Sequence, residues 1–303
     1  MAIRTVVATV NGQQYTLTYN ASTGKYEATI TAPSASSWSQ DEHKYGVTVT
    51  ATDVAGNSTT IDRTDATFGD DLKLRVLEKD APTITELSPS SGSYITNNRP
   101  TITFKLSDTG SGVDTTTTVL KINGTAVSVA DITFTAVSGG YTGSYAVPTA
   151  LSEGSNTISV SVSDNDGNTA ATVSSTFTVD TVNPELNVTT PEDGLITNVA
   201  ACTVAGTTND VTSTPVTIAI TLNGNDQGNV TVDNTGAFSK VVTLANGSNT
   251  IVITATDAAG RTTTVTRTVT LDTAAPVFTA VSIVPNPVDC GATYVISVTV
   301  TDA

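Results

Sequence analysis

One short stretch near the middle of the chain has the composition of a cation-binding turn. Residues 164–168 read Asp-Asn-Asp-Gly-Asn, so side-chain oxygens recur at every second position. Carboxylate and amide oxygens are the ligands that calcium prefers, and the same alternation opens the calcium loop of EF-hands. The EF-hand pattern then fails, because its twelfth position is Ser175, which supplies no bidentate carboxylate.

Two interpretations of this turn stay open. In the first, calcium joins Asp164 or Asp166 to Asp180, an acid in the linker before the next part of the chain. In the second, the residues form an Asx-turn inside a hairpin, which uses Asp, Gly and Asn without any ion. A similar turn farther along the chain has Arg261 where this one has Asn168, and that difference weakens the case for metal.

A second group of distinctive residues surrounds the single tryptophan. Trp38 and Tyr45 lie in a polar segment, and a second polar insertion follows at about residues 61–71. Long loops on a rigid scaffold often carry binding residues. Trp38, with Gln40 and Asp41, has the groups that stack on a sugar ring and bond its hydroxyls. The alternative is that Trp38 closes the open end of a hydrophobic core.

No arrangement of residues indicates catalysis. The chain contains no G-x-S-x-G, no P-loop and no H-E-x-x-H motif. His43 has no cysteine near it, and acidic pairs such as Asp41 and Glu42 are ordinary loop charges. Cys202 and Cys290 lie far apart without a C-x-x-C motif, so we expect two free thiols. We assign no catalytic, cofactor-binding or metal-ligating residue and expect a protein that is not an enzyme.

Composition narrows the range of partners. The 303 residues include 28 acidic and 13 basic side chains, giving a net charge of −15, which repels phosphate backbones. No apolar run approaches the roughly 20 residues of a membrane-spanning helix, and the first apolar run is too short for a signal peptide. We therefore expect no nucleic-acid partner, no membrane insertion and no signal peptide.

The elements that hold these turns follow a repeated pattern. Segments 47–53, 158–164 and 251–257 each alternate apolar and polar residues and end in Asp. A period of two predicts a half-buried strand. A glycine three positions after each Asp supplies the positive φ of a hairpin turn, and a Thr-rich strand follows.

Further landmarks keep the same order along the chain. Three prolines begin units, and an aspartate lies 26 residues after each: Pro82 with Asp108, Pro184 with Asp210, and Pro276 with Asp302. The acids just before these prolines are Asp80, Asp180 and Asp272. Asn-Gly hairpin turns begin at Asn11, Asn123 and Asn223. Two of the strands that precede the aspartates alternate cleanly, with apolar residues at Ile102, Phe104 and Leu106 and at Ile296, Val298 and Val300. These landmarks establish a tandem repeat of about 90 to 110 residues.

Short strands with regular turn signals predict two-sheet antiparallel sandwiches. The Asp-x-x-Gly-Asn turn, the linker acid before proline and the Asn-Gly hairpin resemble the bacterial Ig-like (BIg-type) modules of surface adhesins and tailed-phage virion proteins. The fold class expected is all-β, with tandem Ig-like antiparallel β-sandwiches in a rod-like array. The resemblance covers nearly the whole chain and says little about the ligand.

The frame of the repeat divides the chain into four parts. We predict an incomplete Ig-like unit at 1–80, complete units at 81–181 and 182–273, and a two-strand partial unit at 274–303. The first part lacks the first two strands of the repeat, and the last part contains only those two. A sheet with open edges and an uncovered apolar face invites pairing with another chain. One hypothesis is that the last pair completes the first unit of another copy or of a neighbouring protein. The alternatives are a fragment or a reduced first sandwich.

The resemblance implies a structural or adhesive role. The first expectation is a phage or prophage virion protein, in the tail or as a capsid accessory, that acts as a spacer or contacts the host surface. The alternative is a bacterial cell-surface adhesin or extracellular filament subunit, and the weaker alternative is a carbohydrate-binding accessory module. Expected partners are other copies or neighbouring structural proteins at open sheet edges, and a host-surface glycan. The expected location is the virion or the extracellular surface. No cofactor is expected, with calcium left open.

Overall fold

The computed structural model describes residues 2–302, which consist mainly of β-strands and turns. Helix in this range is limited to three short 3-10 turns, η1 (Asp41–His43), η2 (Gly69–Leu72) and η3 (Val129–Asp131). The predicted all-β class is confirmed. None of the helices in this range has the length and apolar character needed to cross a bilayer. Two compact units divide the chain, Met1–Val179 and Asp180–Ala303, and each is described by itself.

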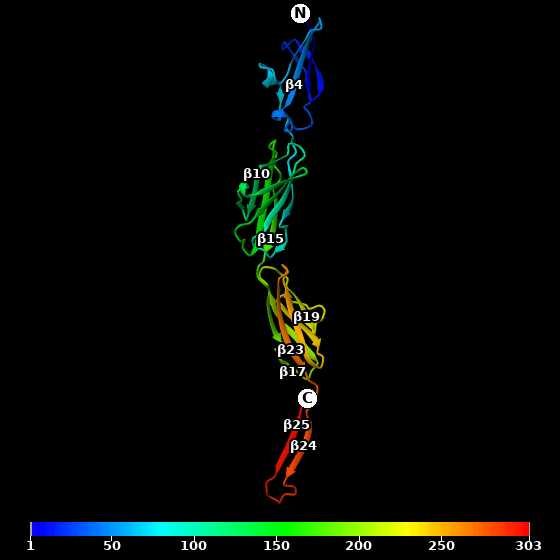
Figure 1. Ribbon diagram of the computed structural model, residues 1–303, viewed down its shortest axis with the longest axis vertical. Coiled ribbons are helices and arrows are strands. Elements are labelled where there is room, and N and C mark those ends of the chain that lie inside the picture. Colours follow the sequence, from blue (N-terminus) through cyan, green and yellow to red (C-terminus); the bar gives the residue numbers. More distant parts are fainter. Residues whose placement is uncertain (1, 303) are drawn as a thin grey trace. The chain divides into compact units, whose positions relative to one another are not determined.

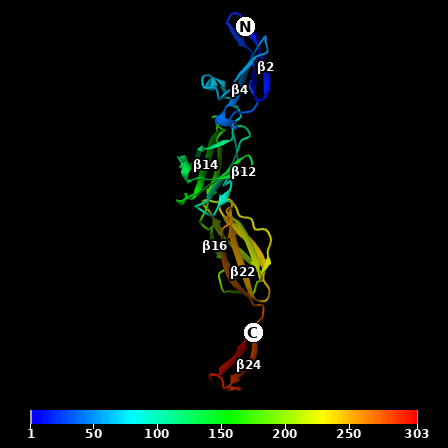
Figure 2. The same ribbon diagram turned by 45° about the horizontal axis from the view of Figure 1, so that its top comes forward.

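The N-terminal part of the first unit forms one six-stranded sheet in the order β3-β2-β1-β4-β5, with β6 also paired to β4. Its strands are β1 (Ile3–Val10), β2 (Gln13–Asn20), β3 (Lys25–Glu27), β4 (Tyr45–Asp53), β5 (Ser58–Ile61) and β6 (Lys73–Leu74). Figure 2 labels β2 and β4 in this sheet. Positive φ angles at Asn11 (44°) and Gly12 (75°) give the tight hairpin between β1 and β2 that the Asn-Gly pair predicts.

This first sheet is covered along β1 and open along β4. Residues Val6 and Ala8 of β1 are buried. Their register partners in β4 are Ala51 and Val49, which are only partly buried. Within residues 2–80, no strand takes the place that β7 and β9 occupy in the next sandwich. One apolar strip of the sheet is therefore incompletely covered.

A two-sheet sandwich completes the first unit. One sheet has the order β11-β10-β14-β15-β8 and the other the order β12-β13-β9-β7. The strands are β7 (Thr83–Ser88), β8 (Tyr94–Ile95), β9 (Thr101–Ser107), β10 (Val113–Ile122), β11 (Thr125–Ala126), β12 (Thr133–Val137), β13 (Gly140–Ala146), β14 (Gly154–Asp164) and β15 (Val173–Val179). Figure 2 labels β12 and β14, one strand from each sheet. Phe104 from one sheet and Val160 from the other belong to one buried core, as the period-two alternation predicts.

The second unit contains a sandwich of the same design. Its sheets have the orders β16-β18-β21 and β17-β23-β22-β19-β20. The strands are β16 (Glu185–Thr190), β17 (Leu195–Thr197), β18 (Ala201–Asn209), β19 (Thr217–Leu222), β20 (Asn225–Asp226), β21 (Ala237–Thr243), β22 (Gly247–Thr256) and β23 (Thr262–Leu271). Val204 and Ile253, from opposite sheets, are completely buried in its core. The sandwich therefore has its own hydrophobic core.

The last two strands, β24 (Val277–Val284) and β25 (Val295–Thr301), form an isolated antiparallel hairpin. Figure 1 shows this pair in red. Every residue of both strands is exposed, including Ile296, Val298 and Val300. The corresponding residues of β9, at the same distance from the unit's proline, are Ile102, Phe104 and Leu106, and these are at most 1% exposed. The hairpin therefore has the apolar residues of core strands, but they are not buried in the described chain.

Candidate functional site

The same Asp turn closes a strand hairpin three times in the chain. In each turn, one oxygen of the Asp accepts a hydrogen bond from the backbone N–H four residues later. The three pairs are Asp53 with Asn57 at 2.9 Å, Asp164 with Asn168 at 2.8 Å, and Asp257 with Arg261 at 2.9 Å. The Asx-turn interpretation is thus confirmed, since the backbone of the turn needs only the first carboxylate oxygen.

The second carboxylate oxygen distinguishes the three turns. The side-chain amide of Asn57 donates to Asp53 Oδ2 at 2.9 Å, and that of Asn168 donates to Asp164 Oδ2 at 2.7 Å. These hydrogen bonds lower the pKa of Asp53, with the Asn57 side chain as the largest cause. Arg261 has no amide to offer.

The third turn therefore leaves one oxygen without a partner. The Arg261 side chain instead donates from Nε to Asn183 Oδ1 at 3.0 Å. Asp257 Oδ2 is buried and has no hydrogen-bond partner within the described part of the chain. A buried carboxylate oxygen without a donor is costly, because it has lost water and gained nothing in exchange.

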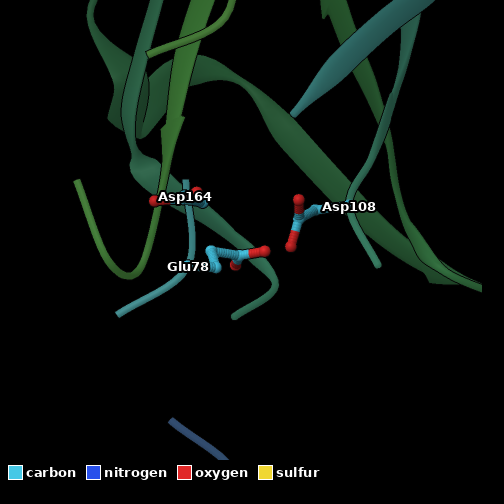
Figure 3. A group of neighbouring side chains, drawn as sticks. All are labelled: Glu78, Asp108 and Asp164. Carbon is cyan, nitrogen blue, oxygen red and sulfur yellow. The ribbon is translucent and has the colours of Figure 1, made fainter. Parts of the chain in front are cut away.

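An acidic cluster surrounds the second of these turns. Glu78 precedes β7, Asp108 follows β9, and Asp164 ends β14. Each offers a carboxylate oxygen, and the three oxygens lie within 4.8 Å of one another. Figure 3 shows the Glu78 carboxylate directed toward Asp108. Topology thus collects three acids that are far apart in sequence.

Backbone amides satisfy much of this first cluster. Asp108 Oδ2 accepts from the N–H groups of Gly110 at 3.0 Å and Gly112 at 2.6 Å. Glu78 Oε1 accepts a short hydrogen bond from the N–H of Ser111. With both oxygens of Asp164 also bonded, the Glu78–Asp108–Asp164 cluster is held largely by protein donors.

Asp166 is not a member of this acidic cluster and connects segments within the first unit. Its side chain is 2% exposed and its carboxylate approaches Arg75 at 3.8 Å. Its Oδ2 accepts from Ser36 Oγ at 2.5 Å and from the N–H of Glu78 at 3.2 Å. Asp166 therefore anchors a loop of the first sheet and the linker to the turn after β14.

A second cluster occupies the corresponding place in the second unit. Asp180, Asp210 and Asp257 bring carboxylate oxygens within 4.8 Å of one another. Their exposures are 0%, 6% and 6%, so all three are buried. No Lys, Arg or His nitrogen among residues 2–302 forms an ion pair with any of them. At an effective dielectric constant of 20, two unit charges at this separation repel by about 3 kcal/mol.

Only part of this second cluster is satisfied by protein donors. Asp180 accepts from the N–H of Val182 at 3.0 Å and takes a short hydrogen bond from the Ser213 hydroxyl. Asp210 Oδ1 accepts from the N–H groups of Thr212 at 2.8 Å and Ser213 at 2.7 Å. These bonds orient two of the carboxylates, while Asp257 Oδ2 lacks a donor.

The proposed pairing of Asp164 or Asp166 with Asp180 is wrong. Asp164 lies with Glu78, and Asp180 lies with Asp257. In both sandwiches the linker acid joins the acidic cluster of the sandwich that follows it, and it lies four residues before that sandwich's first proline. Glu78 has this position relative to Pro82, whereas Asp80 does not. The spacing of four residues identifies Glu78, and the nearness of Asp80 to Pro82 obscured this signal in the sequence.

The candidate sugar-binding residues in the loops of the first sheet do not form an exposed aromatic surface on which a sugar ring can stack. The ring of Trp38 stacks on His43, with centroids 3.8 Å apart and planes 6° apart. Tyr45 is buried and its hydroxyl donates to the Ala35 carbonyl at 3.3 Å. One face of the indole is therefore already occupied.

Charged residues in the same loops form a small exposed network. Lys73 Nζ lies 3.0 Å from both Glu42 and Asp70. The hydrogen bonds to Lys73 lower the pKa of each carboxyl, and hydrogen bonds to Asp70 and Glu42 raise the pKa of Lys73. Such solvent-exposed pairs serve loop structure and give no reactive group.

Both cysteines are free thiols, as expected. Cys202 is buried in the core of the second unit and Cys290 is exposed in the hairpin loop. Burial raises the pKa of the Cys202 thiol. Neither cysteine belongs to an acidic cluster.

Comparison with protein-family models places known domains along most of the chain. Two models described as "Bacterial Ig-like domain" match residues 2–70 and residues 80–181. A model described as "Glucodextranase, domain B" matches residues 184–273. Bacterial Ig-like domains therefore stand in tandem in this chain.

One curated relative is similar over part of the chain. Bacillopeptidase F of Bacillus subtilis (strain 168) is 34% identical over 114 residues, which is 38% of this chain. The match spans about 7% of that protein's length.

Solved structures with a similar fold include fibronectin(III)-like modules of Clostridium thermocellum CbhA and the D1-D2 domains of Rst. The first is 14% identical with a TM-score of 0.40, covering 62% of this chain and 94% of that one. The second is 12% identical with a TM-score of 0.38, covering 64% of this chain and 100% of that one.

Proposed function

We propose that this chain, which carries bacterial Ig-like domains in tandem, is a non-catalytic structural protein of a phage or prophage virion. In the tail or on the capsid it acts as a spacer or contacts the host surface. Copies join when the β24–β25 hairpin of one chain covers the open strip of the first sheet of another. The protein then works on the virion or another extracellular surface.

The observation that carries this proposal is the exposure of the hairpin. The side chains that would face a core are Phe278 (68% exposed), Ile296 (57%), Val298 (48%) and Val300 (47%). Burying such a face gains roughly 25 cal/mol for each Å² of apolar surface. An isolated two-stranded hairpin is marginally stable in water, so a covering partner stabilises it.

The first sheet offers the matching acceptor. Val49 and Ala51 of β4 are only partly buried. The corresponding β14 residues Val160 and Val162 are at most 1% exposed, beneath the sheet that contains β7 and β9. The β24–β25 hairpin has the repeat position of β7 and β9, which makes it the natural cover for the strip along β4.

Sedimentation of the full chain over a wide concentration range tests the assembly. We expect association that rises with concentration and is abolished by Val298→Lys, which places a charge on the core-facing side of β25. The matched control Ser297→Lys adds the same charge to the opposite side and is expected to leave association unchanged. A full chain that stays monomeric throughout, or equal association by both variants, refutes pairing between copies.

The alternative is a bacterial cell-surface adhesin or extracellular filament subunit. Tandem bacterial Ig-like domains agree with this role as well. Mass spectrometry of purified phage particles and of cell envelopes from the same culture separates the two. Enrichment in particles supports the virion role, and enrichment in envelopes supports the adhesin.

A carbohydrate-binding accessory module is the weaker alternative. The match of residues 184–273 to a domain of a glucodextranase favours it. The stacking of Trp38 on His43 argues against the tryptophan as a sugar platform. Glycan-array binding by the full chain that Trp38→Ala abolishes would support a sugar site at that loop.

A further inference from the structure

We propose that Asp180, Asp210 and Asp257 bind one calcium ion. The site lies within the second unit and is formed by the segment before β16, the segment after β18 and the turn after β22. Calcium binding at this site is independent of the proposed structural role, because it requires neither pairing between copies nor a place on the virion.

The unpartnered oxygen points to a ligand. Asp257 is 6% exposed, and its Oδ2 has no hydrogen-bond partner among residues 2–302. In the other two Asp turns, the side chain of Asn57 or Asn168 caps the equivalent oxygen. The presence of Arg261 in place of Asn removes the cap and leaves the oxygen to coordinate a cation.

The chemistry and spacing of the donors fit calcium. All three side-chain ligands are carboxylates, which are hard oxygen donors, and no basic side chain pairs with them in the described chain. Calcium binds oxygens at about 2.3–2.6 Å, so two ligands on one ion are at most about 5 Å apart. The three carboxylate oxygens meet this limit, lying within 4.8 Å of one another.

Calcium also accounts for the burial of like charges. Asp180 and Asp210 accept hydrogen bonds from Val182, Thr212 and Ser213. Those bonds hold the two carboxylates close to Asp257 in the absence of a compensating positive side chain. A divalent ion supplies that charge at the point where the three carboxylates converge.

We do not propose a calcium ion at the Glu78–Asp108–Asp164 cluster. Asn168 caps Asp164 Oδ2 there, and Glu78 and Asp108 accept backbone N–H groups. It serves instead as the internal comparison for the uncapped site.

Hydrogen exchange of the full chain, followed by mass spectrometry during a CaCl2 titration, tests the site locally. The buffer is stripped of metal with chelator, and NaCl keeps ionic strength constant. We expect at least tenfold slower exchange in peptides covering 210–213 and 257–261, with saturation that defines a Kd. Absence of any calcium-dependent change in these peptides overturns the proposal.

Two variants and one control sharpen the test. Asp257→Asn removes a ligand and is expected to weaken calcium binding at least tenfold. Arg261→Asn restores the amide cap without changing a carboxylate, and is expected to weaken binding several-fold. Glu192→Gln removes one exposed carboxylate from the same sandwich and is expected to leave the Kd unchanged. Exchange in β22 without calcium reports whether each variant is folded.

The outcomes separate the assignment from its alternatives. Calcium binding by Asp257→Asn with the wild-type Kd overturns the proposed ligand set. Equal protection by MgCl2 and CaCl2 at the same concentrations overturns the choice of calcium. Protection that follows ionic strength alone, in NaCl, shows screening of charge and overturns a bound ion.

Discussion

Substitution of Asp257 by Asn is predicted to change the stability of the second unit in opposite directions with and without calcium. Asp257 shares two of the three close carboxylate pairs, whose oxygens lie within 4.8 Å. The substitution removes the Coulomb repulsion between ionised carboxylates at this separation. Each pair then costs about 3 kcal/mol at an effective dielectric constant of 20. The Asn amide retains an oxygen for Arg261 N–H and turns an unpartnered acceptor into a donor facing carboxylates.

In chelator, Asp257→Asn is therefore expected to raise the free energy of unfolding by about 3 kcal/mol, even if one pair alone is relieved. In saturating calcium the order reverses, because the wild-type chain binds the ion in its folded state and the variant has lost a ligand. A structural role without metal predicts the same sign in both buffers.

Cys202 provides an assay confined to the relevant sandwich. Its thiol is buried in that core, and a Cys290→Ser background removes the exposed thiol. When opening is fast relative to labelling, the rate of thiol modification follows the equilibrium population of the unfolded sandwich. A gain of about 3 kcal/mol slows labelling about 100-fold. Faster labelling of Asp257→Asn in chelator would refute the charge argument.

Further predictions concern hydrogen bonds and close packing in the first sheet and in the two sandwiches. Asn249→Ala removes four hydrogen bonds of 2.7–3.0 Å at a buried side chain. In the same thiol assay, we expect it to lower the free energy of unfolding by about 4 kcal/mol. The control Asn225→Ala, at an exposed position, is expected to lower it by less than about 0.5 kcal/mol. Gly140→Ala would place a Cβ 1.9 Å from a backbone oxygen of β9, so urea unfolding followed by tyrosine fluorescence should show a loss of about 2–3 kcal/mol. The lowered pKa of Asp53 means that its stabilising bonds persist above the ordinary Asp pKa and fade as pH falls through the lowered value. In an NMR titration, Asn57→Ala should move the Asp53 midpoint upward.

The strands were predictable because alternation and turn chemistry are local. Val160 and Ile253 are buried where a period of two places them, and Asn123 and Asn223 have the positive φ angles of tight hairpins. Each signal is contained within about ten residues, so no knowledge of the tertiary fold was needed.

The acidic clusters were not predictable in the same way. Asp108 and Asp210 were recognised as markers of the repeat, but their membership of the acidic clusters depends on how strands from two sheets converge at one end of a sandwich. Glu78 was missed because Asp80 lies nearer the proline. A constant offset of four residues, not proximity, identifies the linker acid.

Arg261 affects the proposed calcium site in a way that the residue pattern alone does not reveal. Its replacement of Asn appeared to remove a ligand, yet the backbone N–H at that position makes the turn's bond in all three cases. The Asn side chain acts as a cap on the carboxylate. Its loss therefore frees an oxygen, and the physical effect of the substitution is opposite to the one that motif matching predicts.

The three Asp turns make the same hydrogen bond to the backbone but differ in the surroundings of the second carboxylate oxygen. Asp53 is capped in a sheet without counterparts of β7 and β9, Asp164 is buried and capped, and Asp257 is buried and uncapped. In each complete sandwich, the linker acid and the residue after β9 or β18 bring two further carboxylates to the buried turn. Capping comes from one side chain four residues after the Asp. Because the two features have separate sources, loss of the cap alone is the change that we propose opens the buried turn of the second unit to calcium.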